Sequence, residues 1–132
     1  MTTTSDTYII DTHALVWYLT DDAKLSEQAA SIIERSEHGD LTIAIPTIVL
    51  AELLTIVEKK RAPLAMPRVL DWMISNTGVV VYSFDLMVFA ELVRIGGGLD
   101  LHDRIIAATA TRYGVPVITR DPALRNAVRA VW

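Results

Sequence analysis

Four carboxylates stand within or beside apolar segments, where a folded chain normally excludes charge. They are Asp11 in YIIDTHALVWYL, Glu52 in IPTIVLAELLTIV, Asp103 in LHDRIIAATA and Asp121 at the end of GVPVITRD. An unpaired buried carboxylate costs several kcal/mol or takes up a proton. Divalent cations, which prefer hard oxygen ligands, would compensate four such groups together. The alternative is four independent helix caps or ion pairs.

Apolar runs separated by turn residues predict the elements that must position these acids. Strands are expected at 7–10, 41–45, 79–82 and 115–119, with an edge strand at 129–132. Helices are expected at 12–19, 26–36, 46–57, 67–76, 85–95, from His102 or Asp103 to 113, and at 122–128. This alternation predicts an α/β fold, a three-layer α/β/α sandwich around a parallel five-stranded sheet. If the strand order is 3-2-1-4-5, the first and fourth strands are neighbours. The helix at 46–57 is apolar on nearly every face, so we expect it to be buried.

This topology brings the four acids to one end of the sheet. Ligands of open parallel sheets bind beyond the carboxyl ends of the strands, where the strand order reverses. Asp11 after the first strand and Asp121 after the fourth would face each other there. Glu52, a turn into the helix after the second strand, and Asp103, at the start of the helix that feeds the fourth, lie on the same side. Mg²⁺ or Mn²⁺ would relieve their repulsion and support phosphodiester hydrolysis, which predicts a nuclease.

Length and composition limit the other possibilities. The 132 residues fit a single domain, 1–132, with 1–6 as a flexible tail. Without Cys, a membrane-length apolar run or a signal peptide, we expect no disulfide, no membrane and a cytoplasmic location. The net charge of −4 argues against a generic nucleic-acid coat. The basic run 59–61 is either a phosphate-binding patch or the solvated end of a helix, which we favour.

In these segments the chain resembles PIN domains, and among them the VapC-type toxins. The resemblance covers nearly the whole chain and rests on IIDTHALVWYL (9–19), IPTIVLAELLTIVEKKR (45–61), LDLHDRIIAATA (99–110) and VITRDPALR (117–125). It implies a Rossmann-like sandwich, cleavage of RNA with Mg²⁺ or Mn²⁺, a homodimer and a cognate VapB-type antitoxin. It also implies the site residues: Asp11, Glu52, Asp103 and Asp121 as catalytic metal ligands, Thr119 as their support and Asp100 as an auxiliary acid.

Other polar and aromatic residues adjoin these acids. His13 would contact substrate or a metal-bound water, or form a helix-start hydrogen bond. Arg104 and Arg120 would orient phosphate or, as we favour, pair with neighbouring carboxylates. A zinc site with His13 and His102 lacks a known spacing, and His102 is expected to help its helix start. Aromatic residues such as Trp17 are interpreted as core or interface residues, because no basic residues are interleaved with them.

Some apolar helix residues exceed what a core requires. They include Trp72, Met73, Met87, Val88 and Phe89. We expect a dimer or antitoxin interface to cover part of this surface. The antitoxin is expected to present Arg or Lys to the acidic crevice.

Other functions fit the sequence less well. An aspartyl-phosphate phosphatase resembles a DxDx(T/V) pattern, but His13 replaces its second acid. A response-regulator receiver would need Lys where Asp121 stands, and Asp85 as its phosphoacceptor. A non-catalytic PIN-like binding module or a housekeeping PIN nuclease are the alternatives to a toxin. The presence of all four acids favours an active nuclease.

Overall fold

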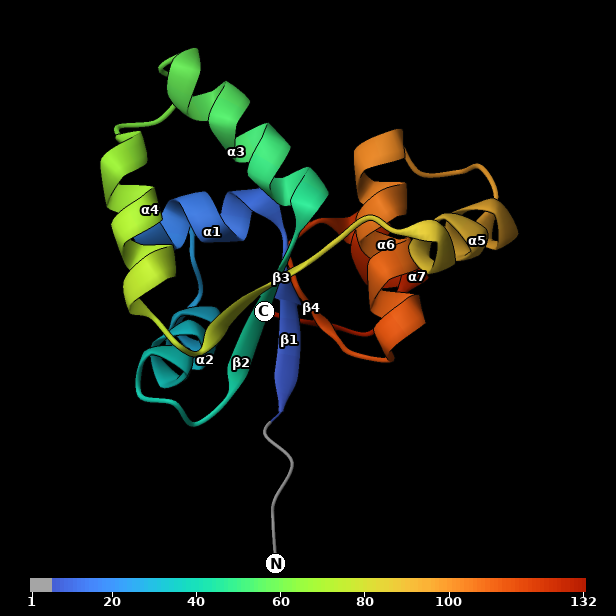
Figure 1. The fold of residues 1–132 in the computed structure, drawn as a ribbon, viewed down its shortest axis with the longest axis horizontal. Coiled ribbons are helices and arrows are strands. Elements are labelled where there is room, and N and C mark those ends of the chain that lie inside the picture. The colour runs from blue at the N-terminus through green and yellow to red at the C-terminus, as the bar shows by residue number, and fades with distance from the viewer. Residues whose placement is uncertain (1–5) are drawn as a thin grey trace, which may run out of the picture.

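The computed structural model describes residues 6–132 and contains a five-stranded parallel sheet between two layers of helices (Figure 1). The strands are Thr7–Ile10 (β1), Thr42–Pro46 (β2), Val79–Tyr82 (β3), Val117–Ile118 (β4) and Ala130–Val131 (β5). The helices are Thr12–Leu19 (α1), Glu27–Glu37 (α2), Thr47–Glu58 (α3), Met66–Ser75 (α4), Leu86–Ile95 (α5), Leu101–Tyr113 (α6) and Pro122–Ala127 (α7). The strand order β3-β2-β1-β4-β5 confirms the predicted 3-2-1-4-5 sheet.

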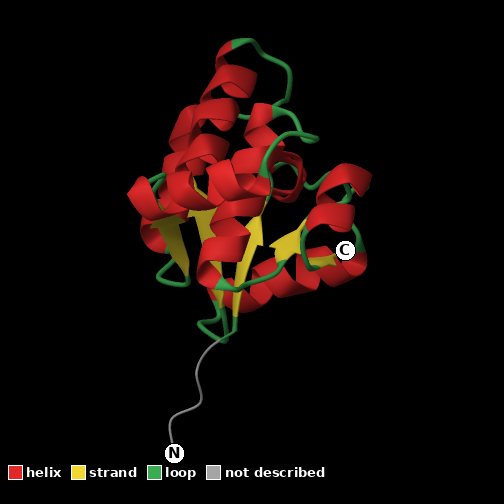
Figure 2. Ribbon diagram, turned by 90° about the vertical axis from the view of Figure 1, so that its right-hand side faces the viewer, coloured by secondary structure: helices red, strands yellow, loops and turns green. Residues whose placement is uncertain are grey.

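Helices on both faces explain the composition of the central strands. Figure 1 shows α1, α2 and α4 on one side of the sheet and α5, α6 and α7 on the other, and Figure 2 shows the strands enclosed between them. Strands covered on both faces are continuously apolar rather than alternating. Ile9 in β1 and Ile43 in β2 are accordingly fully buried, whereas Val80 and Val81 on the edge strand β3 are exposed.

Most predicted elements differ from the structure by a single residue at one or both ends, and two differences lie next to site acids. The helix expected to begin at His102 or Asp103 begins at Leu101, because the Asp100 carboxylate caps it and accepts a hydrogen bond from the Asp103 N–H at 3.0 Å. The strand expected at 115–119 is only Val117–Ile118, which pairs with β1 and β5. Asp103 therefore lies in the first turn of α6 rather than at its first residue, and Asp121 lies three residues after β4. Both acids remain at the same edge of the sheet.

The expected burial of the helix that follows β2 was wrong. In α3 only Val49 and Leu53 are buried, and the Leu54 side chain is 46% exposed. One face of α3 packs against α1, α6 and β2, while the helix extends beyond the edge of the sheet (Figure 1). An apolar sequence therefore did not imply burial here, because no further element covers the outer face.

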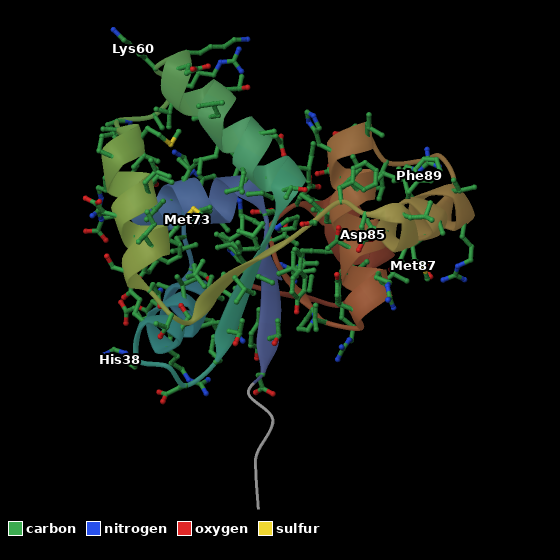
Figure 3. The ribbon with its side chains drawn as sticks, viewed as in Figure 1. His38, Lys60, Met73, Asp85, Met87 and Phe89 are labelled. Atoms are coloured by element: carbon green, nitrogen blue, oxygen red, sulfur yellow. The ribbon has the colours of Figure 1, made fainter. Side chains whose placement is uncertain are left out.

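The apolar helix residues divide between core and surface. Val88, expected on an interface, has no exposed surface and packs in a small core with Leu92, Ile105 and Ala108. Met87, next to it in α5, is half exposed, as is Phe89, and both lie on the layer of helices away from α4 (Figure 3). Trp72 and Met73 in α4 are partly buried against the main core.

The chain ends and the basic run complete the comparison. Of the predicted tail, residues 1–5 lie outside the described residues, and the Asp6 carbonyl accepts a hydrogen bond from the Thr42 N–H at 2.8 Å. Lys59 is the C-cap of α3, so the basic run does stand at the end of a helix, and Lys60 lies at the tip of that helix (Figure 3). Within residues 6–132, no helix has the length and apolar character needed to cross a membrane.

Candidate active site

Asp11 is a buried carboxylate at the junction of β1 and α1. It is only 8% exposed, and its two oxygens accept hydrogen bonds from the Ala14 N–H at 2.9 Å and from the Thr119 hydroxyl. The Asp11 N–H donates to the Ile118 carbonyl at 3.2 Å, which ties it to the end of β4. Burial raises the pKa of Asp11, while the hydrogen bonds from Thr119 and Ala14 lower it. These hydrogen bonds therefore offset only part of the cost of burying the ionised Asp11 carboxylate.

Asp103 lies opposite, in the first turn of α6, among other acids. Partial burial, followed by repulsion from Asp100 and Asp121, raises its pKa to about 7. Together with Asp11 and Glu52, these three acids line one cavity of about 450 Å³ at the carboxyl edge of the sheet. The structure thus brings together every acid that the sequence predicted for the site, including the auxiliary Asp100.

Three of the site acids also cap helices. Asp11, Asp100 and Asp121 begin α1, α6 and α7 and accept from backbone N–H groups at 2.9, 3.0 and 2.8 Å. Independent caps were the sequence-level alternative to a shared site. The structure shows that the two descriptions are compatible, because the N-terminal ends of α1 and α6 meet at one cavity and favour negative charge there.

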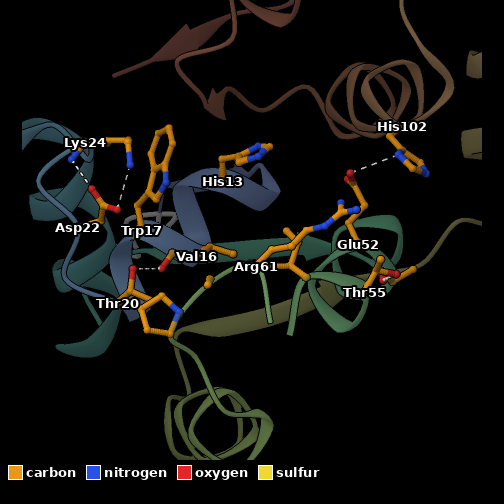
Figure 4. Close-up of a pocket in the computed structure, with 14 residues that line it drawn as sticks. His13, Val16, Trp17, Thr20, Asp22, Lys24, Glu52, Thr55, Arg61 and His102 are labelled. Carbon is orange, nitrogen blue, oxygen red and sulfur yellow. Dashed lines mark hydrogen bonds and ion pairs between the residues drawn. The ribbon is translucent and has the colours of Figure 1, made fainter. Parts of the chain in front are cut away.

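Glu52 reaches the cavity from the second turn of α3 and is held by two partners. Its Oε1 accepts a hydrogen bond from the Thr12 hydroxyl at 2.8 Å, and its Oε2 lies 3.2 Å from Nδ1 of His102 (Figure 4). His102 was expected to help its own helix start. It instead links α6 to α3 through Glu52, and so fixes one carboxylate of the site.

The two arginines beside the acids do not form the ion pairs that we favoured. Arg104 donates two hydrogen bonds to the Leu92 carbonyl, at 3.1 and 2.8 Å, and thereby ties α6 to α5. Arg120 is exposed, and its guanidinium lies 4.6 Å from the centre of the Trp17 ring. Within residues 6–132, no Lys or Arg forms an ion pair with Asp11, Asp103 or Asp121. The acidic cavity therefore lacks a paired cation of its own in this part of the chain.

The donors that face the cavity suit a hard divalent cation. They are carboxylate oxygens, and burial raises the pKa of Asp11 and of Asp103, so a bound cation would favour the ionised form of both. Among residues 6–132, no group of three His, Asp or Glu side chains is already arranged to hold a metal ion. Mg²⁺ usually takes one or two carboxylates and completes its shell with water and substrate phosphate, so the cavity fits such an ion.

A second cavity, of about 580 Å³, continues from the acidic one and was missed by sequence reasoning. The two share His13, Trp17, Glu52 and His102 in their walls (Figure 4). Lys24 lies with its ammonium 5.9 Å from the Trp17 ring centre, and Arg120 covers the same ring. Trp17 packs against the main core, as expected, but basic side chains from other segments also lie beside its ring, which the sequence did not indicate. His13 and Trp17, four residues apart on α1, were the only sequence signal of a shared helix face.

Comparisons with known proteins agree with this fold. Residues 8–130 match the family model of the PIN domain. Ribonuclease VapC22 of Mycobacterium tuberculosis is 29% identical, with 91% of each chain covered. Similar solved structures include VapBC2 from Rickettsia felis bound to a DNA fragment from its promoter (TM-score 0.71, 19% identity, 95% of this chain and 97% of that chain). Another is FitAcB from Neisseria gonorrhoeae (TM-score 0.65, 21% identity, 95% of this chain and 96% of that chain). Because the matched residues run from β1 into β5 and include all the acids of the cavity, the chain belongs to the PIN-domain family.

Proposed function

We propose that this chain is a metal-dependent endoribonuclease and the toxin of a toxin–antitoxin pair. The observation that carries the proposal is one cavity lined by five acids, in which the pKa of Asp103 is raised to about 7. The similarity to a protein named ribonuclease VapC22 over most of both chains supports RNA as the substrate. The family and the site thus point to the same chemistry from independent observations.

The chain's own residues would hold the reacting groups in place. Asp11 is oriented by Thr119 and by the first turn of α1, and Glu52 by Thr12 and His102. When bound, Mg²⁺ or Mn²⁺ would neutralise these carboxylates, polarise the scissile phosphodiester and make an attacking water more acidic. Arg120 and His13, both exposed at the edge of the cavity, are placed to contact the substrate.

Cleavage of RNA tests the enzymatic proposal directly. We expect cleavage of single-stranded or stem-loop RNA with Mg²⁺ or Mn²⁺, and none in excess chelator. The substitutions Asp11→Asn, Glu52→Gln, Asp103→Asn and Asp121→Asn should each lower the rate by about 10²-fold or more. Asp100→Asn should have a smaller effect. Asp71→Asn, an exposed acid on α4, is the matched control and should cleave as the wild type does.

The toxin proposal adds a protein partner. The similar structures from Rickettsia felis and Salmonella typhimurium are those of VapBC2 and VapBC bound to DNA. For this chain we propose a VapB-type antitoxin that presents Arg or Lys to the acidic cavity, because an inserted cation would supply the missing charge. We further propose a homodimer and action in the cytoplasm.

Growth of a bacterial host distinguishes the toxin from its alternatives. Expression of this chain alone should arrest growth, the Asp11→Asn variant at matched expression should not, and the product of an adjacent small gene should restore growth. RNA cleavage without growth arrest would favour a housekeeping nuclease. The absence of both would favour a non-catalytic binding module, for which the lack of three prearranged metal ligands in residues 6–132 is the specific argument.

A further inference from the structure

Trp17 forms an aromatic wall beside the acidic cavity, with cations close to its ring. The residue is half buried on α1, and its ring edge packs against Trp132 with ring centres 5.9 Å apart. The guanidinium of Arg120 lies 4.6 Å from the ring centre and the ammonium of Lys24 lies 5.9 Å from it. Both cations are exposed, and Lys24 also forms an ion pair with Asp22 at 3.4 Å.

This wall continues directly into the acidic cavity. Trp17 lines both cavities, and Arg120 lines the acidic one together with Asp11 and Asp121. On the other wall, Arg61 comes from the α3–α4 connection and lines the same cavity as Trp17 and Lys24 (Figure 4). The five acids therefore lie in one cavity, and the adjoining cavity combines the Trp17 ring with Lys24 and Arg61, although Asp22 and Glu52 also line it.

We propose that Trp17 is a stacking platform for one base of single-stranded RNA, next to the phosphodiester held at the acids. The base takes the place of the Arg120 guanidinium on the ring, and Arg120, Lys24 and Arg61 contact the flanking phosphates. The inference rests on the proposed nuclease function and adds the part of the substrate that the acids cannot recognise. Aromatic side chains combined with basic residues bind single strands because every base has a π-face. Bases of duplex RNA are not accessible in this way, so the platform selects unpaired RNA.

Electrostatics favour RNA over a peptide as the occupant of this end of the cavity. The acids repel a polyanion, so an RNA strand needs nearby cations on each side of the scissile group. The exposed cations Lys24, Arg61 and Arg120 line the joined cavity on both walls, as a phosphate backbone requires. An inhibitor that presents Arg or Lys would fit the acidic end, whereas here it would meet Lys24 and Arg61 as well as Asp22.

Removal of single bases from the RNA tests stacking separately from phosphate binding. The Asp11→Asn variant, which should not cleave, is titrated with a fluorescently labelled single-stranded oligoribonucleotide, and then with a series in which one base at a time is replaced by an abasic ribose. We expect one position at which loss of the base weakens binding roughly 5- to 100-fold. Adding Trp17→Leu should weaken binding of intact RNA by a similar factor and abolish the difference between intact and abasic RNA. Trp17→Phe keeps an aromatic ring and should retain part of that difference. It provides the test of stacking if Trp17→Leu does not fold.

The chain offers a matched control. Tyr113 at the far end of α6 is also partly exposed, with the Arg112 guanidinium 5.7 Å from its ring centre, but it does not line the joined cavity. Tyr113→Leu should therefore leave the base-dependent difference unchanged. Lys24→Ala should weaken intact and abasic RNA equally, because it removes a phosphate contact rather than a stacking partner.

Three other outcomes would contradict the proposal that a base stacks on Trp17. If wild-type protein cleaves RNA but no base position matters, or if Trp17→Leu keeps the base-dependent difference, the stacking proposal is wrong and the nuclease proposal stands. If Trp17→Leu binds RNA normally but loses affinity for the antitoxin, the wall is a protein-binding site instead. If the wild type neither binds nor cleaves RNA, the proposed function fails first and the platform fails with it.

Discussion

The hydroxyl of Thr119 donates a hydrogen bond to Oδ2 of Asp11 across 108 residues of sequence. Thr119 is fully buried at the end of β4, and its Oγ1 also accepts a hydrogen bond from the Asp121 N–H at 3.0 Å. One side chain therefore positions two of the site acids, at the point where β1 and β4 lie side by side.

Replacing Thr119 should damage the site through Asp11. Thr119→Val keeps the shape but removes the donor, so the pKa of Asp11 should rise further and the protein should lose about 1–3 kcal/mol of stability. Metal affinity, measured by Mn²⁺ titration calorimetry, should fall together with the cleavage rate. Thr119→Ser retains the hydroxyl and should restore both. Equal Mn²⁺ affinity in Thr119→Val and wild type would show that this hydrogen bond does not orient Asp11.

The stability of the metal-free protein should fall as pH rises from about 4 to about 7. Asp103 has a pKa of about 7 in the folded protein against an ordinary value of 3.8, so the folded state binds the proton more tightly in this interval. The stabilisation is complete below the lower pKa and lost above the higher one, and the raised pKa of Asp11 adds in the same direction. Urea unfolding in metal-free buffer at several pH values measures this slope.

Two variants and added Mn²⁺ isolate the contribution of Asp103 to this pH dependence of stability. Asp103→Asn should flatten most of it and unfold at higher urea than the wild type at pH 8, because repulsion with Asp100 and Asp121 is relieved. Asp71→Asn should keep the slope. Saturating Mn²⁺ should remove it by binding the ionised acids. A wild-type slope in Asp103→Asn would assign the pH dependence to other groups.

Gly78 is a position where even a methyl group should destabilise the fold. A Cβ added there would lie 2.1 Å from the Ser36 carbonyl oxygen, which belongs to the backbone and cannot rotate away. We expect Gly78→Ala to cost about 1–3 kcal/mol or more in the free energy of unfolding. Gly97→Ala, whose Cβ would meet no atom within 4 Å, should unfold at nearly the wild-type urea concentration.

The exposed face of α5 should form the proposed dimer interface. Leu86, Met87, Phe89 and Val93 are 76%, 50%, 50% and 60% exposed on one short helix. Phe89→Asp should therefore give a monomer by light scattering after size-exclusion chromatography. Ile74 and Leu70 on α4 are 80% and 49% exposed, so Ile74→Asp tests the exposed apolar pair in the other layer and should leave the dimer intact. Dimers of Phe89→Asp at micromolar concentration would rule out this face.

Local sequence determined the elements and, for a parallel sheet of order 3-2-1-4-5, the edge at which the acids lie. Apolar runs, capping residues such as Ser26 and Asp85, and the alternation of strands and helices are properties of neighbouring residues, which is why these elements agree with the structure. The position of Asp11 after β1 and of Asp121 after β4 then followed from the geometry of a parallel sheet.

Tertiary structure alone decided which partner each side chain takes. Arg104 follows a site acid in sequence but binds the Leu92 carbonyl, and His102 contacts Glu52 from another helix. Arg120 and Lys24 flank Trp17 only because three separate segments pack together. Such contacts depend on how whole helices and strands are placed relative to one another. The periodicity of the sequence does not report that placement. The acidic chemistry was therefore visible in the sequence, and the aromatic wall beside it became visible only in the fold.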